Sequence, residues 1–245
     1  MRLLSCCRAL LFTVVAPAFT VSSYAQKTEI KLNAYSGLFS YRGNGTSSTT
    51  TANSNDTFTY WNWQPFGRKS AFSYVFEMQV QRATRKHHLY GLGVSWEELK
   101  SLTRIDSVRG DIPRTIPIKG KINIANSSLT FNPYIGQRFV TGKWNFDVLA
   151  GIDLSICTKL QEAVYYFSPT ESKYTRYYKG YRRKQFGDIR PRIQFNAAYN
   201  QFGIAAGYSI GLQDMYRTEG DYYYRGIKLK AYSNFLRLGI NYKLK

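Results

Sequence analysis

The sequence predicts an all-β fold, an eight-stranded antiparallel up-and-down transmembrane β-barrel of the outer-membrane type. Three patterns predict it: apolar residues at every second position of eight segments, short connections that alternate with long ones, and aromatic residues near both ends of the apolar faces. In the stretch SNFLRLGINYKLK, Leu236, Leu238 and Ile240 alternate with Arg237 and Gly239. A soluble sheet would turn the apolar set toward a core. A membrane barrel turns it toward lipid and fills a narrow lumen with the polar set.

The predicted strands, taken in order, are the segments that show this alternation. They cover residues 28–40, 70–81, 88–99, 127–140, 144–156, 187–199, 201–214 and 231–244. Short turns at 82–87, 141–143 and 200 join strands two to three, four to five and six to seven. The other connections are long and cover residues 41–69, 100–126, 157–186 and 215–230. Because short and long connections alternate strictly, all long loops lie at one end of the barrel and both termini at the other.

Glycine is concentrated on the polar faces of these strands, where a water-exposed strand would favour larger residues. The glycines are Gly91, Gly93, Gly136, Gly151, Gly203, Gly207, Gly211 and Gly239. A lumen just wide enough for side chains explains them, because small residues make room for large neighbours. The predicted lumenal side chains are Glu77, Gln79, Tyr134, Arg138, Asp147, Asp153, Arg190, Arg192, Gln194 and Arg237.

Aromatic residues on the apolar faces fall into two groups, as expected at the two interfaces of a membrane. Near the short-turn end they are Tyr90, Trp144, Tyr199, Phe202 and Tyr242, and near the long-loop end they are Phe72, Trp96 and Tyr232. Two residues conflict with the assignment. Pro133 and Pro191 fall inside predicted strands, and each lacks the N–H group that a closed ladder needs.

The segments LTFNPYIGQRF, FDVLAGIDLSI and LRLGINYKLK resemble strands of small outer-membrane β-barrel proteins of Bacteroidota, the PorT-like and related barrel-domain families. The resemblance spans most of the chain after residue 25 and is one of pattern. It implies an outer-membrane barrel, and for the PorT-like members a role in secretion machinery. A strand proline beside apolar residues is familiar in that group, whereas Lys245 departs from the terminal aromatic residue that many outer-membrane barrels carry.

The N-terminus has the pattern of an export signal. Arg2 and Arg8 precede an apolar run, and a stretch of small residues ends at Ala25. The predicted domains are therefore a signal peptide over 1–25 and a barrel over 26–245. Cys157 alone remains after cleavage and predicts no disulfide. The net charge of +19 becomes +17 without the two arginines of the signal. Such a charge favours anionic partners: lipopolysaccharide and outer-membrane lipid, an anionic glycan or an envelope protein, while export argues against nucleic acid.

No catalytic, cofactor or metal site is predicted. His87 and His88 lie in a short turn on the wrong side for the Ser-His pair of lipid A deacylases, which are also eight-stranded barrels, and no Cys, Asp or Glu joins them at ligand spacing. Carboxylates and arginines share the lumenal face, so a structural ion-pair network is expected. Its members are Glu77, Arg138, Asp147, Asp153, Arg190, Arg192 and Arg237, with Arg138 directly opposite Asp147. Such a network would block general diffusion through the lumen.

The long loops carry the expected function. The residues proposed for recognition combine tyrosine with cations; they are Tyr177, Tyr178, Tyr181, Arg182, Arg183, Lys184, Tyr222, Tyr223, Tyr224 and Arg225. Alternatively, the strands extend beyond the membrane and these cations meet lipopolysaccharide phosphates. The first loop, RGNGTSSTTTANSNDT, is expected to be a flexible polar tract, which the following segment YWNWQPF docks on the barrel rim. We therefore expect a non-enzymatic surface barrel, with a pore, a secretion-machinery subunit and a lipid-modifying enzyme as the alternatives.

Overall fold

A computed structural model describes residues 27–53, 66–109, 115–168, 173–181, 187–216, 223–224 and 227–244. The signal peptide predicted over residues 1–25 lies outside this part of the chain. All secondary structure in the described ranges is β-strand, turn or bend.

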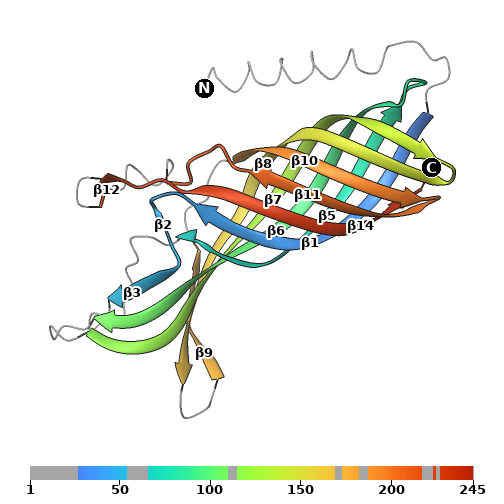
Figure 1. Cartoon of the computed structure of the whole chain (residues 1–245). Helices are drawn as coiled ribbons and strands as arrows, with labels where there is room; N and C mark the ends of the chain where they lie inside the picture. Colours follow the sequence, from blue (N-terminus) through green and yellow to red (C-terminus); the bar gives the residue numbers. More distant parts are fainter. Residues whose placement is uncertain are drawn as a thin grey trace.

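Eight long strands form a closed antiparallel ring (Figure 1). They are β1 (Lys27–Arg42), β5 (Lys69–Ala83), β6 (His88–Arg109), β7 (Thr115–Thr141), β8 (Trp144–Ser168), β10 (Asp188–Tyr199), β11 (Phe202–Ile210) and β14 (Tyr232–Lys243). Around the ring they follow the order β10-β11-β14-β1-β5-β6-β7-β8, and the pairing of β8 with β10 closes it. The predicted fold class and the positions of all eight predicted strands are confirmed.

The lengths predicted for three strands are wrong. The β6–β7 ladder continues to the pair Arg109 and Thr115, so most of the connection predicted over residues 100–126 is a hairpin. Similarly, β8 runs to Ser168 and pairs with β9 (Lys173–Tyr181) within the connection predicted over 157–186. Beyond the barrel the apolar residues change faces, since Leu99, Ile105, Ile122 and Ile124 are buried on the inner face, so the outward apolar pattern on which the prediction relied ends there.

A second sheet region extends from the barrel, and we call it the outer sheet. It consists of residues 98–109 of β6, 115–127 of β7 and 159–168 of β8, with β9 on β8 and β3 (Thr49–Asn53) parallel to β6. Figure 1 shows that its strands curve away from the barrel body. Residues 49–53 of the first loop therefore form a strand rather than the flexible tract that the composition predicts, because the open edge of β6 offers backbone hydrogen-bonding groups. Residues 54–57 of that tract lie outside the described residues.

Four short strands complete the described loops. The first loop also contributes β2 (Thr46–Ser47), which pairs in parallel with β4 (Phe66–Gly67). In the last long loop, β12 (Tyr223–Tyr224) pairs with β13 (Ile227–Lys228).

The polarity of the barrel is inverted relative to a soluble protein. On β14, Leu238 and Ile240 point outward with 59% and 66% of their surface exposed. Arg237, which directly precedes Leu238, points into the lumen and is 0% exposed. The same alternation holds on every strand of the ring. A barrel with a continuous apolar exterior and a charged interior is stable where its exterior contacts an apolar solvent. The outward face of each hairpin is therefore suited to contact with lipid.

Within the described ranges, none of the elements is a helix long and apolar enough to cross a membrane.

The two strand prolines lie where a ladder is interrupted or has not begun. No β7–β8 partner is found for Pro133, which falls between the pairs Phe131–Leu154 and Tyr134–Gly151. Pro191 pairs with Ile152 but precedes the first β10–β11 pair, Arg192–Ser209. A missing N–H group at these places removes few hydrogen bonds, which resolves the conflict raised by the sequence.

Candidate functional site

The lumen near the short-turn end holds a charge cluster centred on Arg138. Its Nε atom lies 2.6 Å from Asp147 Oδ1, and its two terminal nitrogens donate to the Glu29 carboxylate at 3.0 and 2.9 Å. Lys31 Nζ is 2.9 Å from Asp147 Oδ2, and Lys243 Nζ is 2.7 Å from Glu29 Oε1. The ladder places Arg138 directly opposite Asp147, as the three-residue turn predicts. The five side chains come from β1, β7, β8 and β14, so the cluster ties together strands that are distant in sequence.

A second cluster lies farther along the lumen, around Asp153. Arg192 forms a bidentate pair with Glu77 at 3.0 and 3.1 Å and also lies 3.3 Å from Asp153. Arg237 Nη2 donates to Asp153 Oδ2 at 2.8 Å and to Ser209 Oγ at 3.0 Å. Bidentate arginine–carboxylate geometry fixes orientation as well as compensating charge.

Arg190 extends this second cluster toward the long-loop end. It pairs with Glu97, donates to Ser155 Oγ at 2.8 Å and lies 3.9 Å from Asp188. Asp188 accepts a hydrogen bond from Ser233. The pairs therefore continue across the lumen from β6 to β14.

The charges of the lumen balance among the described residues. The acids are Glu29, Glu77, Glu97, Asp147, Asp153 and Asp188, and the bases are Lys31, Arg138, Arg190, Arg192, Arg237 and Lys243. All of them are buried except Lys243, whose side chain is 20% exposed. Burial of an unpaired charge is costly, so equal numbers at close range are what a filled lumen requires.

The structure brings together all seven residues that the sequence predicted for the network. The predicted network did not include Glu29, Lys31, Glu97, Asp188 and Lys243. A signal for two of them was present, because Glu29 and Lys31 share the strand parity of Asn33 and Tyr35, which are also lumenal.

Lumenal glycines make room for these side chains, which confirms the prediction. A Cβ atom on Gly91 would lie 2.4 Å from the phenol ring of Tyr134, and one on Gly239 would lie 2.6 Å from Tyr35 Cδ1. Tyr134 in turn donates to Gln81 Oε1 at 3.2 Å. The lumen therefore has no space for a larger residue at these positions.

The long-loop end of the lumen is apolar, which the sequence did not predict. A cluster that we call the mouth plug fills it: Phe39, Tyr41, Phe66, Met215, Tyr216, Leu229 and Phe235. The rings of Tyr41 and Tyr216 approach Phe66 with centroid distances of 4.8 and 5.0 Å. Phe66, the last residue of the segment predicted to dock on the rim, is fully buried and enters the mouth. Residues 60–65 of that segment lie outside the described residues.

Backbone hydrogen bonds hold the first and last long loops together above the plug. Gly45 N donates to Lys230 O at 2.8 Å, and Tyr216 Oη donates to Gly45 O at 2.7 Å. Asn44 adds bonds to the backbone of Lys228 and Lys230 at 3.0 and 2.7 Å. Two segments far apart in sequence thus close the barrel mouth as one unit.

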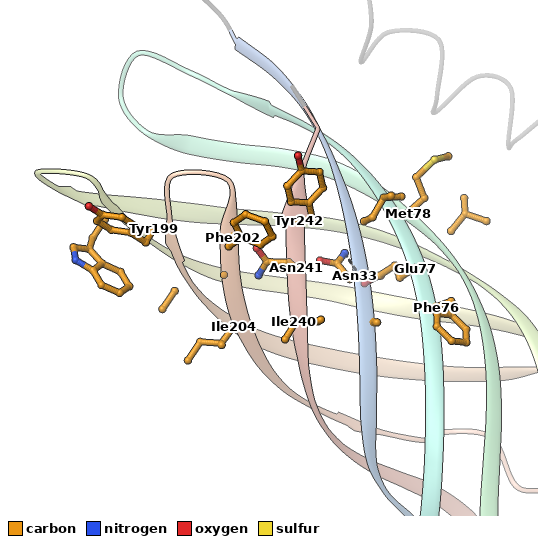
Figure 2. Close-up of a pocket in the computed structure, with 16 residues that line it drawn as sticks. Asn33, Phe76, Glu77, Met78, Tyr199, Phe202, Ile204, Ile240, Asn241 and Tyr242 are labelled. Carbon is orange, nitrogen blue, oxygen red and sulfur yellow. Dashed lines mark hydrogen bonds between the residues drawn. The ribbon is translucent and has the colours of Figure 1, made fainter.

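The exterior has a shallow apolar groove across β11, β14, β1 and β5 (Figure 2). Phe76 and Met78 point outward into it, whereas Glu77 between them points inward and accepts a hydrogen bond from Asn33 at 3.4 Å. Ile204 and Ile240 line the same groove. Its lining is mainly the lipid-facing surface, and the polar side chains of Asn33 and Glu77 beneath it are hydrogen-bonded to each other within the lumen.

The outer sheet carries cations next to aromatic rings on its outward face. Lys100 Nζ lies 5.3 Å from the ring centre of Tyr74, and Lys121 Nζ lies 5.4 Å from that of Tyr165. Glu98 joins the first pair, since Tyr74 Oη donates to it at 2.8 Å and Lys100 Nζ lies 2.7 Å away. Partial burial raises the pKa of Glu98, but the hydrogen bonds from Lys100 and Tyr74 outweigh this effect and lower its pKa overall.

The residues that the sequence proposed for recognition are placed only in part. The backbones of Tyr177, Tyr178 and Tyr181 lie in β9, and those of Tyr223 and Tyr224 form β12. The other five lie outside the described residues, namely Arg182, Arg183, Lys184, Tyr222 and Arg225. β9 pairs with β8 in the outer sheet, which places its tyrosines on that sheet.

His87 is exposed in the turn before β6, and His88, predicted in the same turn, is the exposed first residue of that strand. Among the described residues, no three His, Cys, Asp or Glu side chains gather as a metal site would require.

No protein-family model matches the chain, and no curated protein matches it. Among solved structures, Ail of Yersinia pestis, in complex with the heparin analogue sucrose octasulfate, aligns over 89% of this chain and 99% of its own, with 8% identity and a TM-score of 0.33. Neisserial surface protein A aligns over 88% and 98%, with 8% identity and a TM-score of 0.35. The translocator domain of autotransporter NalP from Neisseria meningitidis aligns over 97% and 95%, with 9% identity and a TM-score of 0.31. The fold class rests on the closed ring of strands rather than on these similarities.

Proposed function

We propose that the chain is a non-enzymatic integral outer-membrane barrel whose lumen is sealed and whose outer sheet and loops recognise an anionic partner at the cell surface. Export would follow cleavage of the signal near Ala25. The observation that carries the proposal is the inverted polarity of the closed ring together with a lumen filled along its length.

The filled lumen argues against a small pore. Two charge clusters, whose acids and bases are equal in number when taken together, occupy its length, and the mouth plug closes the long-loop end. A solute would have to break buried ion pairs, each of which leaves an uncompensated charge when one partner is removed. The lumen therefore serves to stabilise the barrel, and the function resides outside it.

Recognition is supported by what projects from the barrel. The outer sheet extends β6, β7 and β8 past the apolar band, and its cations are arranged beside tyrosine rings. Tyrosine and cationic side chains together suit sugars and acidic groups. The recognition loops predicted from the sequence leave the barrel at the same end.

Two measurements on the purified chain in detergent or lipid test this proposal. Planar bilayers should show no single-channel steps above background, and a soluble polyanion such as dextran sulfate should bind reversibly and weaken as salt is raised. Defined conductance steps would favour the pore instead. Failure of the chain to partition into membranes would remove the proposal altogether.

The remaining alternatives make different demands. A secretion-machinery subunit, which the PorT-like resemblance implies, should co-purify with stoichiometric partners from native membranes, and its deletion should reduce secretion of surface proteins. A lipid-modifying enzyme should change the mass of lipid A in cells that carry the gene.

A further inference from the structure

The exposed charge at the short-turn end of the barrel is concentrated beside one of the three short turns. The turn at 200 carries no charge, and the turn over 141–143 carries only Lys143. The turn over 82–87, between β5 and β6, carries three cations, and the first residue of β1 adds a fourth. We call this group the basic turn: Lys27, Arg82, Arg85 and Lys86. The positive charge is therefore local rather than spread around the rim.

The four cations form one group because the backbone holds them close together. Lys27 pairs across strands with the residue before Thr84, so the Cα atoms of all four cations lie within about 7 Å of Thr84 Cα. The turn itself is fixed, since His87 N donates to Thr84 O at 3.0 Å and Gln137 Nε2 donates to Lys86 O at 3.2 Å. A ligand would meet cations on an ordered backbone, which lowers the entropic cost of binding.

No acid compensates the basic turn within the described part of the chain. The acids at this end of the barrel are Glu29 and Asp147, and both are buried in the lumen. Glu29 is paired with Arg138 and Lys243, and Asp147 is paired with Arg138 and Lys31. The four cations of the basic turn form no ion pair with any described residue. They therefore carry a net charge of +4 that only a partner can neutralise.

The basic turn follows directly on the lipid-facing surface. The last fully apolar rung here pairs three residues across β1, β5 and β6, namely Ile30, Val80 and Leu92. The next outward rung, two residues on, joins Thr28 to Arg82 and Arg82 to Tyr90. Two residues of a strand span about 7 Å, so the change from apolar to cationic is abrupt. Because Tyr90 belongs to the aromatic group of the short-turn end, Arg82 lies at the depth of that membrane interface.

Arg82 is the member of the group that is suited to direct contact with an anion. It is half-buried, and its Nε atom is buried without a hydrogen-bond partner in the described part of the chain. A buried donor that lacks an acceptor costs free energy. A phosphate group accepts two parallel hydrogen bonds from one guanidinium, so a phosphate beside Tyr90 would satisfy this donor.

We propose that the basic turn binds the phosphate of an anionic phospholipid in the leaflet that surrounds the short-turn end of the barrel. Arg82 contacts the phosphate at the interface, and Arg85 and Lys86 at the exposed tip of the turn supply further positive charge, together with Lys27. Since the charge lies beside one turn, the lipid is held at one place on the circumference. The inference rests on the membrane barrel proposed above and concerns the end opposite to the recognition loops.

Native mass spectrometry of the purified chain in detergent tests this inference with two probes, phosphatidylglycerol and phosphatidylcholine that carry the same acyl chains. The test variant is Arg82→Gln/Arg85→Gln/Lys86→Gln. The matched control removes three exposed cations at the long-loop end, Arg104→Gln/Lys119→Gln/Lys230→Gln. A third variant, Arg85→Lys/Lys86→Arg, keeps the charge. Heat-modifiable gel migration establishes that each variant is folded.

The wild-type chain should retain the anionic phosphatidylglycerol preferentially. The test variant should bind it about eightfold more weakly, from about twofold for each contact, while the control and the charge-preserving variant stay within about twofold of wild type. If Arg82→Gln prevents folding, the double variant Arg85→Gln/Lys86→Gln should still bind about fourfold more weakly than its control, Arg104→Gln/Lys119→Gln.

Equal retention of the two lipids by the wild-type chain, or equal binding by the test variant and the control, overturns the inference. The proposed function fails in a different way. A folded, membrane-inserted barrel that binds soluble polyanion but does not distinguish the two lipids would refute the lipid site and leave the recognition role intact. A chain that does not partition into membranes would remove both.

Discussion

Replacement of Arg237 by methionine tests whether the lumenal charges hold one another in place. Arg237 is fully buried, donates to Asp153 at 2.8 Å and to Ser209 at 3.0 Å, and lies 3.7 Å from Glu97. Methionine keeps an unbranched chain of similar reach but removes the charge. Loss of one partner from a buried ion pair costs about 3–5 kcal/mol, because the remaining charge stays desolvated.

The magnitude depends on what remains near Asp153. Arg192 is 3.3 Å away and Arg190 is 3.7 Å away, so Asp153 keeps part of its compensation and we expect the lower end of the range, about 3 kcal/mol. That value lowers the ratio of folded to unfolded barrel by about two orders of magnitude.

Urea unfolding of the refolded barrel in phospholipid vesicles, followed by fluorescence and gel migration, measures this loss. The double variant Arg237→Met/Asp153→Asn removes both charges and should recover about 1–3 kcal/mol relative to additivity. Lys143→Met in the exposed turn is the control and should change stability by less than about 0.5 kcal/mol. A loss below about 1 kcal/mol for Arg237→Met, or strict additivity in the double variant, would refute the reasoning.

Three further predictions concern other parts of the barrel. Gly91→Val should destabilise by about 1–3 kcal/mol in the same unfolding assay, because its Cβ would lie 2.4 Å from the Tyr134 ring, whereas the lipid-facing Ala150→Val should be nearly neutral. Phe66→Ala should empty the centre of the mouth plug and lower the free energy of unfolding by about 3–5 kcal/mol, because the plug unfolds together with the barrel. An unchanged free energy of unfolding with faster proteolysis of the first loop would show that the plug opens independently. In variants that keep one tryptophan each, Trp96 and Trp144 should be quenched by shallow brominated lipids and not by deep ones, and deep quenching of either would contradict the interfacial bands.

The barrel was predictable because its exterior imposes a strict pattern. Lipid requires an apolar residue at every second position, and the short turn over 141–143, where Gly142 has a φ of +61°, fixes the register of its hairpin. Arg138 and Asp147 could be paired from the sequence for that reason. Glu29 and Lys31 lie within the first predicted strand over 28–40, so the same parity applied to that strand would have placed them in the lumen as well.

The mouth plug and the outer sheet lay beyond such reasoning. Phe66 and Tyr216 come from connections without periodicity, and their contact exists only because two loops return over the barrel mouth. The extension of β6 and β7 was missed for another reason, because its apolar residues Leu99, Ile105, Ile122 and Ile124 lie on the inner face, opposite to the lipid-facing parity of the barrel. Where the outer face no longer meets lipid, the outward apolar pattern ends although the strands continue.

The seam between β1 and β14 sets the order in which the molecule can be assembled. These strands pair over twelve positions from Lys31–Lys243 to Arg42–Tyr232, and the Glu29–Lys243 ion pair spans 214 residues of sequence. Before β14 pairs with its neighbours, β1 and β11 are open edges, and Asp153 and Glu97 lack their ion pairs with Arg237. We therefore expect nascent chains to need chaperones until β14 is available. A truncation that removes β14 would leave the ring of strands open and the lumenal charges unbalanced.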